Sequence, residues 1–195
     1  MKDNPIKHFH IDKLEIKSIG HDLQRPECIL AEPDGTLWAA DARGGVMHIK
    51  SDGTQELITQ KRSNDFAKSV SDVDRYTKGT LPNGLAFANN GDILISNFGT
   101  DCLEVMKRTG ETELLLDAIE GEPIGKVNFV LRDSKNRLWI TVTTRLKNWI
   151  DALVPDLDDG YIIRLDERGP HIAAEGFHFT NEVRFDKNEE FLYVV

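Results

Sequence analysis

Apolar and polar residues alternate in short runs along this chain, and each run ends at turn-forming residues such as Asp-Gly or Asn-Gly. Runs of this length, bounded by such turns, predict β-strands. The first series of predicted strands covers residues 28–31, 36–41, 45–50 and 54–59. Because tight turns join them, these strands are expected to form one antiparallel unit.

The same series returns three times. Strands are predicted at 85–88, 92–97, 102–107 and 111–117, then at 129–132, 137–143, 160–165 and 171–175, and a fourth series runs from 182 to 195. The apolar residues that begin the second strand of each series are Leu37, Ile93, Leu138 and Leu192, at spacings of 56, 45 and 54 residues. A four-stranded unit that recurs every ~40–50 residues is typical of a β-propeller blade.

The sequence therefore predicts an all-β fold, a single incomplete β-propeller domain over residues 1–195 with four-stranded antiparallel blades. About three and a half blades are expected, at 25–81, 82–126, 127–180 and 181–195. An unrelated all-β sandwich is the alternative that the same pattern allows.

Three segments depart from the repeat. Alternation at 14–19 predicts one half-buried strand, 60–81 is a long polar connection, and 144–159 is an insertion with a short helix expected at 146–153, ending at Val154-Pro155. In a propeller blade, the loop between the second and third strands returns to the face where the first strand begins. We therefore expect both long segments to lie on that face.

Composition limits the partners and the cellular compartment that are expected for the protein. The net charge of −9 and the pI near 5.1 argue against a nucleic-acid partner, which would need a concentrated positive surface. Cys28 and Cys102 have no metal-ligand spacing and are expected to be reduced thiols. No signal-like or membrane-spanning apolar run is present, which favours a cytoplasmic protein without a membrane partner.

One polar residue precedes the first strand of each repeat. These four positions are Glu27, Asn83, Asn128 and Asn181. The first strands of propeller blades surround the central channel, so the four side chains are expected to converge at its mouth. Carboxylate and amide oxygens favour Ca²⁺, Mg²⁺ or Mn²⁺, and Zn²⁺ can also accept them. The alternatives are turn chemistry, for Asn83 before Gly84, and satisfaction of backbone groups by a buried amide.

Four motifs carry a resemblance to a known family. They are RPECILAEPDGTLWAAD, PNGLAFANNGDILISN, GKVNFVLRDSKNRLWIT and FTNEVRFDKNEEFLYVV, between Arg25 and Val195. In this order and spacing they resemble the gluconolactonase/regucalcin (senescence marker protein) family of six-bladed propellers. The resemblance implies one divalent cation, with Ca²⁺ preferred and Zn²⁺ or Mn²⁺ as alternatives, held by Glu27 and Asn181 with Asn128 beside it. It also implies substrate contacts from Asn128 and from the basic residue two positions earlier, Lys126, and we add Asn83.

The chain also departs from the family pattern. Asn181 is followed by Glu182 rather than by glycine. The family's third ligand, an Asp that is also its proposed general base, would lie beyond Val195, so no catalytic base is assigned. We expect the chain to be a fragment or a truncated product, or a second copy to close the ring as a homo-oligomer through the exposed edge at 191–195.

The function predicted from these observations is divalent-metal-dependent hydrolysis of a lactone or another small ester, so the expected partner is a small molecule. Two alternatives remain open. One is a non-catalytic propeller that binds a small ligand, Ca²⁺ or a protein through the same face. The other is a strictosidine-synthase-like enzyme that uses a Glu without metal.

Overall fold

The structure is a computed structural model that describes residues 7–61 and 79–195, and nearly all of its regular elements are β-strands. The first sheet contains β1 (Ile29–Ala31), β2 (Leu37–Asp41), β3 (Gly45–Ile49) and β4 (Gln55–Thr59). The second contains β5 (Pro82–Phe87), β6 (Ile93–Asn97), β7 (Cys102–Met106) and β8 (Thr112–Leu116). The third contains β11 (Val127–Arg132), β12 (Leu138–Val142), β13 (Gly160–Asp166) and β14 (Gly169–Phe177).

Two hairpins and two short helices complete the described chain. The hairpins are β9 (Ala118–Ile119) with β10 (Glu122–Pro123), and β15 (Val183–Phe185) with β16 (Leu192–Val194). The 3₁₀ helices are η1 (Lys13–Glu15) and η2 (Trp149–Ala152).

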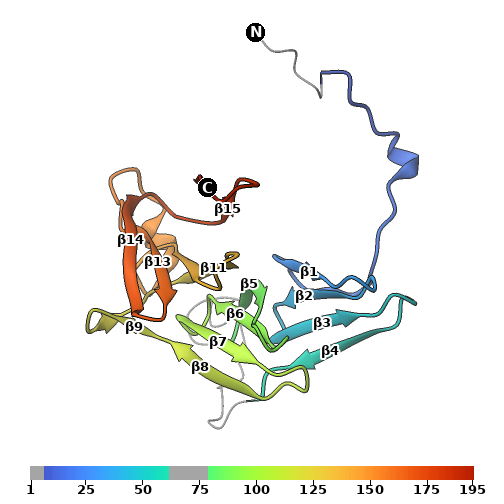
Figure 1. Cartoon of the computed structure of the whole chain (residues 1–195), viewed down its shortest axis with the longest axis horizontal. Coiled ribbons are helices and arrows are strands. Elements are labelled where there is room, and N and C mark those ends of the chain that lie inside the picture. The colour runs from blue at the N-terminus through green and yellow to red at the C-terminus, as the bar shows by residue number, and fades with distance from the viewer. Residues whose placement is uncertain (1–6, 62–78) are drawn as a thin grey trace.

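Consecutive strands pair antiparallel within each four-stranded sheet, and the sheets fan out around a common centre (Figure 1). Strands β1, β5 and β11 lie toward the centre, while β4, β8 and β14 lie outside. This arrangement confirms the predicted propeller, with three four-stranded blades and the hairpin β15–β16. The blade limits drawn from the sequence stay a prediction, because strand pairing does not define where a blade ends.

Packing between neighbouring sheets explains why the middle sheet is buried on both faces. Along β6, Ile93 and Ile95 join one apolar cluster with Trp38 of the first sheet, whereas Leu94 joins another with Ile140 of the third. Successive side chains of a strand point to opposite faces, so one strand supplies both clusters. The sheets therefore hold each other largely by apolar contact, with one backbone bridge between Lys61, after β4, and Glu111, before β8.

Two local predictions fail. Residues 14–19 form no strand: η1 lies here and Leu14 is 91% exposed, because alternation alone supplies neither a partner strand nor a surface to cover. The helix expected at 146–153 is only the single 3₁₀ turn η2, since Asn148 makes no side-chain cap and the insertion is mostly exposed.

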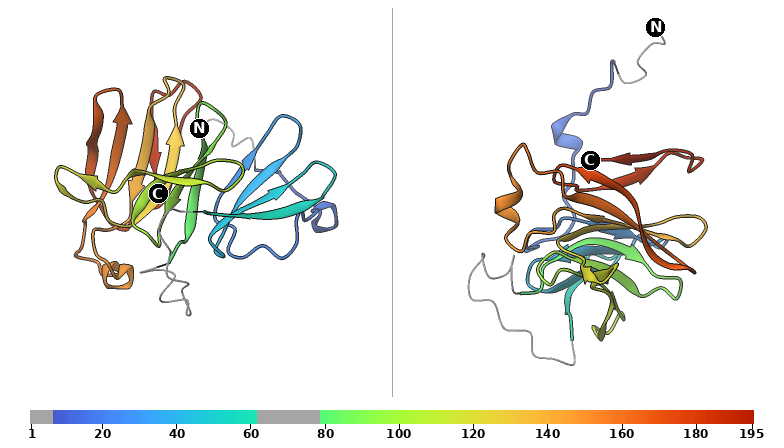
Figure 2. Two further views of the ribbon diagram at one scale, coloured as in Figure 1. Left: turned by 90° about the horizontal axis from the view of Figure 1, so that it is seen from below. Right: turned by 90° about the vertical axis from the view of Figure 1, so that its left-hand side faces the viewer.

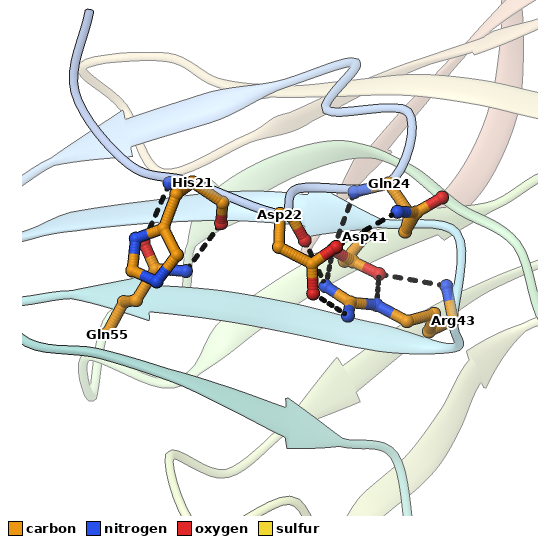
Figure 3. Close-up of polar contacts among 6 residues, drawn as sticks. All are labelled: His21, Asp22, Gln24, Asp41, Arg43 and Gln55. Carbon is orange, nitrogen blue, oxygen red and sulfur yellow. Dashed lines mark hydrogen bonds and ion pairs between the residues drawn. The ribbon is translucent and has the colours of Figure 1, made fainter.

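A polar network fastens the segment before β1 to the first sheet (Figure 3). The carboxylate of Asp41 accepts hydrogen bonds from Arg43 Nε and Nη2, both at 2.8 Å, and from Gln24 N at 3.0 Å. Arg43 also donates to Asp22 O at 2.7 Å. Burial raises the pKa of Asp41, but the hydrogen bonds from Arg43 and Gln24 outweigh it and leave the pKa below its usual value.

Candidate functional site

The first strands of the sheets begin at the same end of the molecule, and two of the four predicted polar residues are in contact there. Asn83 Nδ2 at the start of β5 donates to Asn128 Oδ1 at 2.9 Å and to Asn128 O at 3.0 Å in β11. Both asparagines are buried, with 5% and 8% of their surface exposed. The structure thus joins two of the four predicted positions directly.

Arg25 connects a third position, Glu27, to this pair. Its Nη1 donates to Asn83 Oδ1 at 3.0 Å, and its Nη2 lies 3.1 Å from Glu27 Oε1. Sequence reasoning assigned no role to Arg25. The signal was available, because Arg25 precedes Glu27 by two positions just as Lys126 precedes Asn128.

The hydrogen bonds continue from Asn128 toward the last hairpin. Asn128 Nδ2 donates to Thr143 Oγ1 at 3.0 Å, and Thr143 Oγ1 donates to Thr180 O at 2.8 Å. Thr141 Oγ1 donates to Asn181 O at 2.5 Å, so the backbone of the fourth predicted position is fixed while its side chain is exposed. The threonines were not predicted as part of the site, although the Thr-x-Thr pair closes the second strand of its repeat at the same end.

Lys126, directly before β11, lies at the same end and is fully buried. Its Nζ is 2.6 Å from Asp101 Oδ1 and 3.2 Å from Phe98 O, while Lys147 Nζ from the insertion lies 2.7 Å from Asp101 Oδ2. Burial lowers the pKa of Lys126, and the hydrogen bond and charge of Asp101 oppose that shift. No sequence pattern identifies Asp101 as part of this site. It pairs with Lys126 only because the turn after β6 brings the two residues together.

The insertion 144–159 lies at the same end (Figure 2). Trp149 meets Phe98 edge-on, with ring centroids 6.2 Å apart, and lies 5.9 Å from Phe179. Figure 2 shows η2 at the end of the third sheet opposite the β13–β14 turn. The expectation that this insertion shares a face with the polar residues is therefore confirmed.

The two ends of the other long segment, 60–81, also lie at this end of the molecule. Gln60 Oε1 accepts from Thr80 Oγ1 at 2.5 Å, and Asn97 Nδ2 donates to Thr80 Oγ1 at 2.7 Å, at the end of β6. The remainder of the predicted connection, residues 62–78, lies outside the described residues.

A buried carboxylate lies near these residues. The side chain of Glu104 on β7 is fully buried. It accepts from Gln60 Nε2 at 2.5 Å, Asn97 Nδ2 at 3.0 Å and Cys102 Sγ at 3.0 Å. Alternation along the strand does not reveal this burial, because it does not show that both faces of the middle sheet are covered.

The donor chemistry at the mouth suits a hard cation. The carboxylate of Glu27 and the amide of Asn181 are exposed, and Asn128 Oδ1 keeps a second lone pair besides the one that accepts from Asn83. Within residues 7–61 and 79–195 no group of three His, Cys, Asp or Glu side chains could hold a metal ion. A cation here would therefore depend on amide oxygens, and it would share the Glu27 carboxylate with Arg25.

Comparison with solved structures supports the propeller assignment. The chain superposes on a gluconolactonase from Xanthomonas campestris at 18% identity and a TM-score of 0.61, covering 83% of this chain and 50% of that one. A calcium-binding regucalcin from Agrobacterium tumefaciens gives 17% identity and 0.61 over 89% and 50%. A catalytically inactive virginiamycin B lyase from Staphylococcus aureus, solved with quinupristin, gives 17% and 0.61 over 94% and 54%.

These likenesses show the class of fold alone, a β-propeller. The chain spans about half the length of each of these structures. No family model matches the sequence, and no curated protein matches it either. Since one fold hosts proteins with different activities, the chemistry follows from the site rather than from the fold.

The part of the chain that the structure describes contains no helix long and apolar enough to cross a membrane.

Proposed function

We propose that the polar mouth of this propeller hydrolyses a lactone or another small ester with the help of a divalent cation. The observation that carries the proposal is the continuous path of hydrogen bonds from Arg25 through Asn83 and Asn128 to Thr143. It fixes both amide groups in one orientation, and fixed polar groups are what a catalytic site needs to position a substrate.

In this proposal Glu27 and Asn181 hold the cation, with Asn128 beside it. Oxygen donors of this kind favour Ca²⁺, and Mn²⁺ or Zn²⁺ are alternatives. The cation would polarise the ester carbonyl and lower the pKa of a bound water. The similar regucalcin from Agrobacterium tumefaciens is a calcium-binding protein, which supports the choice of ion by analogy.

The remaining residues position the substrate. Asn83 and Asn128 orient its oxygens, and the buried ammonium of Lys126, paired with Asp101, supplies positive charge at the same end of the propeller. Arg25 offers a guanidinium that already bridges Glu27 and Asn83 and can hydrogen-bond a substrate oxygen. No residue is assigned as the general base.

The test is a hydrolysis assay on the purified protein with gluconolactone and aryl esters, after chelation and after addition of Ca²⁺, Mn²⁺ or Zn²⁺. Activity is expected to need one of these ions and to fall by at least roughly 10–100-fold in Glu27→Gln, because loss of a residue that only supports a metal ligand already costs that much. Glu113→Gln, at an exposed position on β8, is the matched control and keeps full activity.

Turnover that survives Glu27→Gln, or that is absent with every ion, contradicts the proposal. Calorimetric binding of a cation without turnover would instead favour the non-catalytic, ligand-binding alternative.

A further inference from the structure

A second polar hollow lies at the end of the third sheet away from the mouth. The turn between β11 and β12 and the turn between β13 and β14 enclose a cavity of about 500 Å³. Strands β11 and β13 both run away from the mouth, so the two turns share the far end of the sheet. The residues of the proposed hydrolytic site are not among those that line it.

The lining of this hollow is positive although the chain is acidic. The charged side chains that line it are those of Lys135, Arg137, Arg164, Arg168, Asp166 and Glu167. Four cations thus face two carboxylates, in a chain whose formal net charge is −9. Such a local reversal of charge favours an anionic ligand.

Two of the arginines keep their outer nitrogens available. Arg137 uses Nε to reach Asp133 Oδ2 at 2.6 Å, and Arg164 uses Nε to reach Asp166 Oδ2 at 3.1 Å. Among the described residues, no hydrogen bond uses the Nη atoms of Arg137 or Arg164. Since a guanidinium donates through Nη as well as Nε, each can still form a two-point contact with an oxyanion.

The two guanidinium groups are also held in place before any ligand arrives. Their Cζ atoms lie 5.6 Å and 5.8 Å from the centroid of the Trp139 ring, which itself donates from Nε1 to Asp133 Oδ2 at 2.9 Å. The side chain of Asp133 is fully buried and that of Asp166 is 9% exposed, so the anchoring carboxylates are fixed. Binding would therefore require little ordering of the arginines.

We propose that this hollow, bounded by the turns at 133–137 and 166–169, binds a phosphate group, either as inorganic phosphate or as the phosphoryl end of a small ester. Arg137 and Arg164 supply the two-point contacts, and Arg168 and Lys135 supply additional charge. A phosphate group matches the guanidinium fork in geometry and charge, whereas Asp166 and Glu167 in the same lining disfavour a long polyanion. The proposal is independent of the hydrolytic site.

The experiment is titration of the purified protein with inorganic phosphate at low ionic strength, followed by isothermal calorimetry and by phosphorus NMR line width. Saturable binding is expected, and it should weaken at least about tenfold in Arg164→Gln and in Arg137→Gln, since each change removes a charge-assisted contact. Arg164→Lys keeps the charge but not the fork and should give an intermediate loss. Circular dichroism verifies that each variant is folded.

Arg108→Gln is the matched control. Arg108 lies 4.9 Å from the ring of Trp38 and pairs with Glu32 at 2.6 Å, so it repeats the arginine–tryptophan–carboxylate arrangement outside this hollow. It should leave phosphate affinity unchanged. Titration that does not saturate, equal binding in wild type and both glutamine variants, or an equal loss in Arg108→Gln would each overturn the proposal. A competition experiment tests which group is recognised. If inorganic phosphate displaces a bound phosphate ester, the phosphoryl end of the ester is the recognised group.

Discussion

At the level of single residues, the polar mouth depends on two side-chain amides that each accept one hydrogen bond and donate another. Asn83 accepts from Arg25 through Oδ1 and donates to Asn128 through Nδ2, and Asn128 then donates to Thr143. Each asparagine therefore lies between a donor and an acceptor and links neighbouring blades. A hydrogen bond between buried groups in such a path is expected to be coupled to its neighbours.

A double-mutant cycle on Asn83→Ala and Asn128→Ala measures this coupling. Each single change should cost about 1–3 kcal/mol of unfolding free energy, because a buried partner loses its hydrogen bond. The double variant should cost less than the sum by roughly 0.5–3 kcal/mol. Denaturant unfolding gives these values, with the exposed turn residue Asn90→Ala as the control. Strict additivity would mean that the two amides do not act together.

At the scale of elements, the distance between β5 and β11 decides whether the two asparagines meet. A Cβ at Gly84 would lie 2.5 Å from Phe129 Cα and 2.8 Å from Asn128 O. Gly84 lies inside β5, so Asn83-Gly84 serves a close approach of strands rather than a turn, which corrects the turn interpretation of this pair.

Gly84→Ala should accordingly destabilise the protein by about 1–3 kcal/mol or more, because the neighbouring backbone has to move. Gly53→Ala is the comparison. Gly53 has a φ of +86° in an exposed turn with nothing within 4 Å of a built Cβ, so it probes backbone strain alone. Thermal unfolding of both variants separates the two effects. A smaller loss in Gly84→Ala than in Gly53→Ala would show that the strands can separate freely.

At the scale of the whole molecule, Tyr161 joins three segments that are distant in sequence. It belongs to β13, its hydroxyl donates to Ile124 O at 2.5 Å after the β9–β10 hairpin, and Arg145 of the insertion lies 4.3 Å from its ring centroid. Burial raises the pKa of Tyr161 to about 12, partly opposed by the charge of Arg145.

Stability should therefore decline in alkali. Below pH ~10 the hydroxyl is protonated in both states, but between pH ~10 and the folded pKa of about 12 the unfolded chain loses this proton and the folded chain keeps it. The free energy of unfolding consequently falls with pH across that window. Tyr161→Phe should flatten this part of the profile, measured by denaturant unfolding at pH 9 to 12. An unchanged slope in Tyr161→Phe would assign the decline to other groups.

The sequence by itself determined the strands of the sheets and which strands share a blade. The signals were local: the alternation of apolar and polar residues, the turn residues, and the spacing of Leu37, Ile93 and Leu138. Such patterns can be recognised without a structure. The same reasoning failed at 14–19, where a suitable pattern lacks a partner strand.

For the site, the repeat pointed to Asn83 and Asn128, which the fold brings into contact, while a metal role for Glu27 and Asn181 stays a prediction. Packing in three dimensions was needed to show that Arg25 bridges Glu27 and Asn83, that Asp101 pairs with Lys126, and that two arginines lie against Trp139. These contacts join residues from different strands and turns. Their distances follow from sheet packing and strand twist, which no local pattern of residues encodes.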